Sequence, residues 1–342
     1  MKIKYLIFIT LLISAGCAST NGTNPKVEFI PDEVNNELEI YIDDKLFTNF
    51  FYPDNMEKPV LYPIYTSSGK DITRGYPYNP KPFERYDHPH HVGLWLNFGD
   101  VNGLDFWNNS FAVNPENKHK YGSIRFREII SQDPGSGVLV AGSDWVDNDN
   151  NILLNEETTF VFNENDGVRS IKRTSTLTAV QDVRFQGNEE GLLGLRVDRA
   201  FEEPADSPQR LLDGQGNMKD ERILDNEGVN GAYRNADGDR GSAVWGERSP
   251  WVALSAEKEE EVITIAIFDH HANPYYPAWS HARGYGLFAV NNLGGRDMHN
   301  DAEEVEINLS PGESISFTHL IIIGEDMTDD ELNQIHNQFN NH

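Results

Sequence analysis

The clearest structural signal of the chain is GVLVAGSDWV from Gly137 to Val146, DNDNN from Asp147 to Asn151 and ILLNEETTFVF from Ile152 to Phe162. Its two outer segments are rich in apolar and β-branched residues, and the five residues between them are polar turn formers. Two such runs on either side of an Asn- and Asp-rich turn are typical of a β-hairpin. The sequence therefore predicts two antiparallel strands here.

The same pattern recurs on both sides of this hairpin. A second hairpin is predicted at Lys26–Tyr41, where Val34–Glu37 forms the turn. Further strands are predicted at Val168–Val180, Val262–Asp269 and Ser314–Ile323. Many strands separated by turn signals favour an all-β fold, a large antiparallel β-sandwich.

Only the C-terminus carries a helical signal. Thr328 and Glu331 form a capping box ahead of the apolar Leu332 and Phe339, which predicts a short C-terminal helix. Residues 202–246 are rich in Gly, Asp, Asn and Arg and show little periodicity. We therefore expect a long loop there, and loops of that length often carry function.

The N-terminus predicts export with a lipid anchor. Lys2 and Lys4 precede a short apolar run, and small residues lead from it to Cys17, the only cysteine of the chain. An apolar run this short is typical of a signal peptide rather than of a membrane span. We expect lipidation at Cys17, on the cell membrane or the outer membrane and facing the periplasm. The expected parts are a lipoprotein signal peptide with its lipobox cysteine at 1–17, a tether at 18–26 and a single β-sandwich domain at 27–342.

The composition limits the chemistry and the partners of this domain. The 342 residues include 55 Asp and Glu but only 28 Lys and Arg, which gives a formal net charge of −27. Nucleic acids are held mainly by Lys and Arg contacts to phosphate, so we expect no nucleic-acid partner. With one cysteine, which the lipid would take, the domain has no internal disulfide, no thiolate metal cluster and no cysteine nucleophile.

Residue types that bind sugars concentrate in two stretches. The first contains TRGYP (Thr73–Pro77), YDHPHHVGLW (Tyr86–Trp95) and DVNGLDFW (Asp100–Trp107). The second contains FDHHANP (Phe268–Pro274) and AWSHARGYGLF (Ala278–Phe288). Aromatic faces stack on the apolar faces of a pyranose while fixed polar groups bind its hydroxyls, so the mixture favours carbohydrate recognition. The candidates for stacking on a sugar are Trp95, Trp107, Trp245, Trp251 and Trp279.

Three histidines lie within four residues of the first stretch. Pro89 excludes a regular helix around His88, His90 and His91. In a strand, side chains two residues apart share a face, so we expect His88 and His90 to converge and His91 to point away. Histidine is the commonest metal ligand. Three roles therefore stay open for these histidines, namely binding of a divalent metal, acid–base catalysis and contact with a substrate. Because no HExxH or other strong ligand pattern is present, we expect no cofactor.

Several of these strings, together with NEEGLLGLRV (Asn188–Val197) and WGERSPWVAL (Trp245–Leu254), occur in order between about Val27 and Gly324. In this respect the sequence resembles the family named methane oxygenase PmoA-like. The resemblance implies a β-sandwich related in shape to sugar mutarotases, a supersandwich, and a role in polysaccharide degradation. It also implies an activity, dehydration of the non-reducing-end uronic acid of ulvan oligosaccharides to a 4,5-unsaturated uronate.

Such a dehydratase, a carbon–oxygen lyase, needs a cation for the carboxylate, a base for the C5 proton and an acid for the departing 4-hydroxyl. Arg283 or Arg74 suits the first role. The catalytic candidates are His90, His91, His281, Tyr285 and Glu190. The substrate-binding candidates are Arg74, Tyr76, Trp95, Trp107, Arg283 and His271. The expected partners are a uronate-containing oligosaccharide and, through the lipid, the membrane.

Other functions stay open. One is a glycoside hydrolase that uses Glu190 with Asp105 or Glu84 as its carboxylate pair. Another is a mutarotase-like enzyme on algal oligosaccharides. A third, outside catalysis, is a lipoprotein that holds glycans near the membrane without turning them over.

Overall fold

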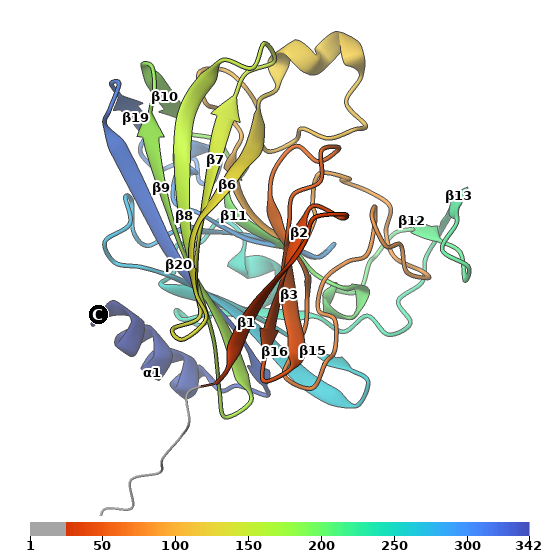
Figure 1. Cartoon of the computed structure of the whole chain (residues 1–342). Helices are drawn as coiled ribbons and strands as arrows, with labels where there is room; N and C mark the ends of the chain where they lie inside the picture. The colour runs from red at the N-terminus through yellow and green to blue at the C-terminus, as the bar shows by residue number, and fades with distance from the viewer. Residues whose placement is uncertain (1–24, 342) are drawn as a thin grey trace, which may run out of the picture.

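Two eight-stranded antiparallel sheets pack face to face in the computed structural model, which describes residues 25–341 (Figure 1). This arrangement confirms the predicted all-β sandwich. The predicted signal peptide, the lipidation site Cys17 and residues 18–24 of the predicted tether lie outside the described residues. No helix within residues 25–341 is long and apolar enough to cross a membrane.

The first sheet carries the candidate site, and the second carries the hairpin from which the fold was predicted. In spatial order the first sheet contains β1 (Val27–Asp32), β2 (Glu37–Ile42), β3 (Lys45–Phe51), β4 (Val60–Ile64), β5 (Leu94–Phe98), β11 (Gly191–Arg196), β18 (Leu287–Asn291) and β17 (Trp279–Arg283). The second sheet contains β14 (Ala232–Asn235), β15 (Trp251–Lys258), β16 (Glu261–Asp269), β20 (Ser314–Glu325), β9 (Val168–Ala179), β8 (Ile152–Asn165), β7 (Val138–Val146) and β6 (Ser123–Asp133).

Shorter elements lie outside the two large sheets. Two small antiparallel pairs join β10 (Val183–Gln186) to β19 (Glu306–Leu309) and β12 (Gln209–Leu212) to β13 (Met218–Ile223). Within the described residues the only α-helix is α1 (Asp329–Asn340). The short 3-10 helices are η1 (Pro115–Lys120), η2 (Arg199–Phe201), η3 (Gly241–Val244) and η4 (Gly295–Asp297).

The predicted hairpins are confirmed. Strands β7 and β8 pair from Val138 opposite Val161 to Val146 opposite Ile152, and the Asp147 carboxylate closes the turn by accepting the Asn151 N–H at 2.8 Å. Strands β1 and β2 pair in the same way at the N-terminus. In the neighbouring strand β9, alternate residues are buried, as a two-layer sandwich requires.

The core lies between the two sheets and is rich in aromatic rings. Phe47 of the first sheet contacts Phe162 of the second, with ring centroids 6.0 Å apart, and Phe50 contacts Phe160 at 5.9 Å. Burial of each such side chain stabilises the fold by about 1.5–3 kcal/mol. The two sheets are thereby held as a firm support for side chains on their outer faces.

Helix α1 covers part of the outer face of the second sheet, over β15, β16 and β20 (Figure 1). Leu332 and Phe339 pack against Trp251 and Phe268 of the strands beneath. The predicted capping box is present, because Thr328 Oγ1 accepts the Glu331 N–H at 3.3 Å and the Glu331 carboxylate accepts the Thr328 N–H at 2.8 Å. The first sheet has no such helix within residues 25–341.

The segment 202–246, predicted as one long loop, contains more regular structure than expected. It includes the hairpin β12–β13, which projects from the side of the sandwich in Figure 1, as well as β14 and η3. Leu211 and Leu212 are buried and hold the hairpin against the body of the protein. A strand of four residues gives too little periodicity to be recognised from the sequence.

Candidate functional site

Four adjacent strands of the first sheet place a row of residues on its outer face. Trp95 of β5 lies opposite Gly194 of β11, Gly194 opposite Ala289 of β18, and Ala289 opposite His281 of β17. Side chains alternate along a strand, so the neighbours of these residues point into the core. A Cβ atom on Gly194 would lie 2.5 Å from the Trp95 ring and 3.0 Å from that of Trp107. The small residues therefore leave room for two indoles above the sheet.

The next row on this face carries two arginines. Arg196 and Arg283 both lie opposite Leu287, one on each side of it. Tyr285 occupies the turn that joins β17 to β18, and the Arg196 guanidinium lies 5.0 Å from the Tyr285 ring. Sheet register thus brings residues from distant parts of the chain to one surface.

The three neighbouring histidines meet above this surface. The chain turns at Pro89–His90, and the His91 N–H donates to the His88 carbonyl at 3.0 Å. His88 stacks on His91 at 5.0 Å between ring centroids, and His90 lies 4.3 Å from His91. The expectation that His91 points away from the others is wrong, because a turn rather than a strand positions them. Tyr285 stacks with His88 at 4.9 Å.

Trp95 and Trp107 lie beneath the histidines. His91 packs on Trp95 at 5.3 Å and contacts Trp107 at 5.8 Å, while Trp107 packs on His281 at 6.0 Å. Both indoles are fully buried. Protein groups cover their faces, so in this conformation neither offers an open face to a sugar and both support the histidines.

Buried polar atoms without partners are concentrated in this cluster. His90 Nε2, His91 Nε2, His281 Nδ1 and the two indole N–H groups have no hydrogen-bond partner within residues 25–341. Most buried polar atoms in folded proteins are hydrogen-bonded, because an unmade bond costs about 1–3 kcal/mol. Their number in one place indicates that a bound molecule or water completes the site.

The environment keeps these imidazoles neutral. Burial lowers the pKa of His90 and of His91 well below the usual value, and nearby cationic and histidine groups act in the same direction. Burial, with Arg283 as a second cause, lowers the pKa of His281 to about 3. A neutral imidazole has a free lone pair at near-neutral pH, so each ring is able to accept a hydrogen bond, while its lowered pKa makes it a weaker base than an exposed histidine.

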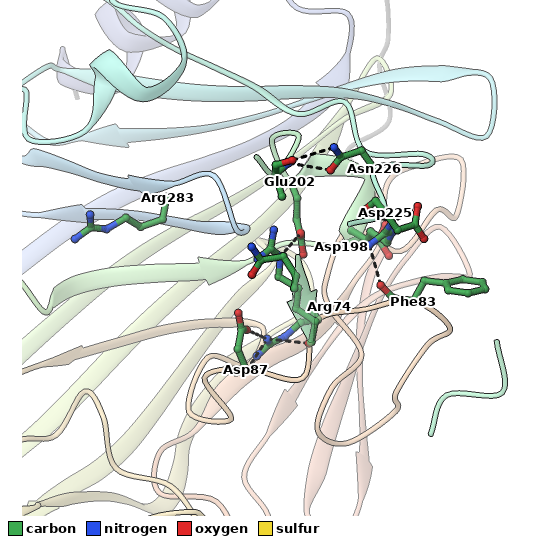
Figure 2. A network of polar contacts seen from close by, with 12 residues as sticks. Arg74, Phe83, Asp87, Asp198, Glu202, Asp225, Asn226 and Arg283 are labelled. Atoms are coloured by element: carbon green, nitrogen blue, oxygen red, sulfur yellow. Dashed lines mark hydrogen bonds and ion pairs between the residues drawn. The ribbon is translucent and has the colours of Figure 1, made fainter. Parts of the chain in front are cut away.

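Glu190 and Arg283 lie at the side of the cluster. Burial and then the neighbouring Glu189 raise the pKa of Glu190 to about 7. Arg283 lies 3.5 Å from a Glu189 oxygen and 4.6 Å from the Trp245 ring. Its side chain is 34% exposed, and Figure 2 shows it directed away from the Arg74–Asp87 contacts. Arg283 is therefore a cation that solvent reaches.

Arg74 has a different role from the one expected of a substrate-binding arginine. It is buried, and it donates to Asp87 Oδ1 at 2.8 Å and to the carbonyls of His88 and His91 at 2.9 Å each (Figure 2). Arg196 donates to the same Asp87 oxygen at 2.7 Å. Burial opposes ionisation of Asp87, but Arg196, with further help from Arg74, holds its pKa well below the usual range. These contacts fix the histidine turn.

Two further candidates lie outside the cluster. Tyr76 is buried beneath the Arg74 guanidinium, 5.4 Å from it, and belongs to the support of the turn. His271 follows β16 of the second sheet and contacts Asn340 of α1, with His271 Nδ1 2.8 Å from Asn340 Oδ1. The structure does not bring His271 together with the other candidates, because its strand ends on the layer that α1 covers.

Sequence reasoning missed Lys58. This residue is buried, its ammonium donates to the His90 carbonyl at 2.7 Å, and it lies 5.1 Å from the Trp95 ring. Burial lowers the pKa of Lys58 to about 7, although Asp105 acts against the shift. A single lysine before a strand carries no pattern, so only the three-dimensional structure reveals it. Within the described chain, no group of three or more His, Cys, Asp or Glu residues is arranged to hold a metal ion.

Solved structures with a distant likeness to this chain include carbohydrate-active enzymes. A GH36 α-galactosidase AgaB from Geobacillus stearothermophilus is 11% identical, with a TM-score of 0.41, over 87% of this chain and 41% of that one. An α-galactosidase from Lactobacillus brevis is 8% identical, with a TM-score of 0.39, over 87% and 39%. A polysaccharide lyase is 10% identical, with a TM-score of 0.34, over 92% and 34%. This chain thus spans about two fifths or less of their lengths.

The comparisons of sequence give a family but no activity. No curated protein matches the chain. Residues 37–337 match the model of a family of unknown function, DUF6807, a span that covers most of the described sandwich. The chain therefore belongs to the DUF6807 family.

Proposed function

We propose that this protein is a carbohydrate-active hydro-lyase that removes water from the non-reducing-end uronic acid of an oligosaccharide and leaves a 4,5-unsaturated uronate. The observation that carries the proposal is the cluster of neutral, unpartnered imidazoles on a face that also presents a partly exposed arginine. Elimination next to a carboxylate needs this combination, because the C5 proton becomes acidic only when the carboxylate charge is neutralised.

The partly exposed side chains are the ones we assign to substrate contact. His90, Tyr285, Glu190 and Arg283 are partly open to solvent, whereas His91 and His281 are buried beneath them. Arg283 binds the carboxylate, and His90 accepts the C5 proton. The pKa of Tyr285 is raised to about 12, chiefly by burial, so its hydroxyl keeps its proton and is available as the acid.

The proposed step balances without a cofactor. The C5–H electron pair forms the C4=C5 bond, and the C4–O bond breaks with its electrons on oxygen. His90 takes the C5 proton, and Tyr285 gives a proton to the departing hydroxyl, which leaves as water. Proton return from His90 to Tyr285, through solvent, restores both groups. Glu190, with its pKa raised to about 7, binds the sugar hydroxyls or shares in this return.

The biological setting is part of the proposal. The resemblance to the PmoA-like family supports ulvan-type oligosaccharides as the substrate and polysaccharide degradation as the process. The short apolar run before Cys17 supports a lipid anchor, and the lack of acidic residues just after Cys17 supports the periplasmic side. Both inferences rest on the sequence.

The deciding experiment incubates the protein with oligosaccharides that end in glucuronate or iduronate, and with their methyl esters. We expect ultraviolet absorbance from a conjugated double bond and the mass loss of one water from the intact chain. Arg283→Met is expected to reduce the preference for the acid over the ester, because it removes the carboxylate partner. The absence of any unsaturated product from the whole panel would refute the dehydratase.

A second candidate function is glycoside hydrolysis with Glu190 and Asp105. Burial raises the pKa of both carboxyl groups, and the charge of Asp105 adds to the shift at Glu190, a pattern seen in carboxylate pairs of hydrolases. Glu84, the other partner considered, is unsuited to this task because its oxygens accept the N–H groups of Gly75, Tyr76 and Lys81. Mass spectrometry separates the functions, since hydrolysis adds water and shortens the chain.

A further inference from the structure

Two arginines face each other on the hairpin β12–β13. Arg210 and Arg222 are cross-strand partners in its antiparallel register, and both side chains are exposed. Like charges directly opposite each other destabilise a strand pair. Neither guanidinium lies within 4.0 Å of a carboxylate in residues 25–341, although Asp220 and Glu221 precede Arg222. In a chain with 55 acidic and 28 basic residues, an uncompensated pair of arginines needs an explanation.

The pair lines a cavity of 210 Å³. The other residues around it are Arg85, Tyr86, Asp87 and Gln209. The charge of Arg85 already has an acidic partner, since its Nε donates to Glu202 at 2.6 Å. The charge of Asp87 also has partners, because one of its oxygens accepts hydrogen bonds from both Arg74 and Arg196. The free charge at this cavity is therefore positive and comes from the hairpin.

The hairpin is fixed to the segment that leads into the candidate site. The Leu212 N–H donates to the Glu84 carbonyl at 2.9 Å, and the Tyr86 hydroxyl donates to the Lys219 carbonyl. Asp87 lines the cavity, and the next residue, His88, stacks with Tyr285 at 4.9 Å. The cavity thus adjoins the surface at which we place the reaction.

We propose that Arg210 and Arg222 form an anion subsite for a substituent, a sulfate ester or a carboxylate, on the sugar unit next to the reacting uronate. Two guanidinium groups hold several anionic oxygens through paired, charge-assisted hydrogen bonds. A bound anion removes the repulsion between the opposed arginines. The neighbouring sugar is thereby positioned, and the identity of this sugar rests on the proposed function, whereas anion binding itself does not.

Anion binding is tested first, without turnover. Calorimetry measures the binding of inorganic sulfate and of glucuronate to the protein and to the Arg210→Ala, Arg222→Ala double variant. A matched control, Arg184→Ala with Lys120→Ala, removes the same charge at exposed positions elsewhere. We expect affinity for at least one probe to fall by about tenfold or more in the double variant and by less than about twofold in the control. Equal affinities in the protein and the double variant would overturn the subsite.

Kinetics then identify the natural substituent. Trisaccharides with a sulfate ester, a carboxylate or neither on the second sugar are compared as substrates. The double variant is expected to raise KM about tenfold for one charged substrate, with kcat and the uncharged substrate unaffected. A rise for sulfate alone identifies the ester, and a rise for carboxylate alone identifies a second uronate. An equal rise for all three would contradict the subsite. If no substrate reacts, the dehydratase fails, and the calorimetry still decides the subsite.

Discussion

The outer faces of the two sheets are built in opposite ways. On the second sheet, α1 buries an apolar surface that includes Trp251, Phe268, Leu332 and Phe339. On the first sheet, loops cover a surface in which imidazole, guanidinium and indole groups lie against one another and several nitrogen atoms lack partners. Both faces belong to antiparallel sheets of eight strands.

This difference shows where the molecule accepts a cost in stability. Apolar packing under α1 lowers the free energy of the fold, whereas buried polar atoms without partners raise it. A protein that keeps such atoms on one face, while a helix packs on part of the other face, is organised around the polar face. Changes on the first sheet should therefore affect chemistry, and changes under α1 should affect stability.

The largest effect is expected from His90→Ala. If His90 accepts the C5 proton, kcat for elimination should fall by about 10²- to 10⁴-fold, with the thermal midpoint nearly unchanged. His271→Ala is the matched control, because this histidine contacts α1 on the other sheet. Rates of unsaturated uronate formation and thermal melts provide the measurements. Full activity in His90→Ala, or an equal loss in His271→Ala, would break the distinction between the two faces.

The reverse effect is expected from Leu332→Ala. Leu332 is fully buried on the inner face of α1, and its truncation removes apolar contacts and leaves a cavity. The free energy of unfolding should fall by about 3 kcal/mol, as seen in denaturant titrations. The activity of each folded molecule should stay within about twofold of the parent. A large loss of kcat in fully folded protein would mean that α1 also shapes the polar face.

Local patterns were enough to predict the fold class, some of its strands and its C-terminal helix, but not the strands of the first sheet that carry the candidate site. The runs around Asp147–Asn151 specified β7 and β8, and Thr328 with Glu331 specified the start of α1. The residues that make up each signal lie close together in the sequence, so each signal can be recognised without knowledge of the rest of the chain. The hairpin β12–β13 lacked such a signal because its strands are short and its outer residues polar.

The candidate site was predicted only in part, because sheet register assembles it. His90, His281 and Tyr285 were chosen from residue type, and the structure joins them in one cluster through His91 and Trp107. Sequence reasoning had no access to the pairing of Trp95 with Gly194 or to the burial of Lys58 beside His90. A turn in place of a strand also reversed the expected direction of His91.

A third prediction concerns the pH dependence of stability. The pKa of Glu190 is about 7 in the folded protein and near its ordinary value of 4.5 when unfolded. As the pH rises, the folded state therefore keeps the Glu190 proton to a higher pH than the unfolded state does. The stabilising contribution of protonated Glu190 is complete below pH 4.5 and disappears as the pH rises to about 7. After allowance for the partial exposure of Glu190, the free energy of unfolding falls by about 2 kcal/mol over this pH range.

Glu190→Gln tests this coupling on the polar face. The glutamine side chain of the variant does not titrate, so its stability does not fall with the pH in this way. The free energy of unfolding of the variant, relative to that of the parent, should therefore increase by about 2 kcal/mol between pH 4.5 and 7.5. Denaturant titrations across this range measure the difference. Parallel curves for parent and variant would show that burial does not shift the pKa of Glu190. On the helical face, Glu331 behaves oppositely, because hydrogen bonds with Thr328 lower its pKa.

The smallest effect is expected from Thr328→Ala at the start of α1. The change removes the hydroxyl that accepts the Glu331 N–H, and loss of such a cap costs about 1 kcal/mol. Thr328→Ser, which keeps the hydroxyl, should retain most of the stability and serves as the control. Activity should not change in either variant, because α1 contacts only the second sheet's outer surface among the clusters described. If removal of this cap lowered kcat without unfolding the protein, the two faces would be energetically coupled through the core, and their separate roles would have to be abandoned.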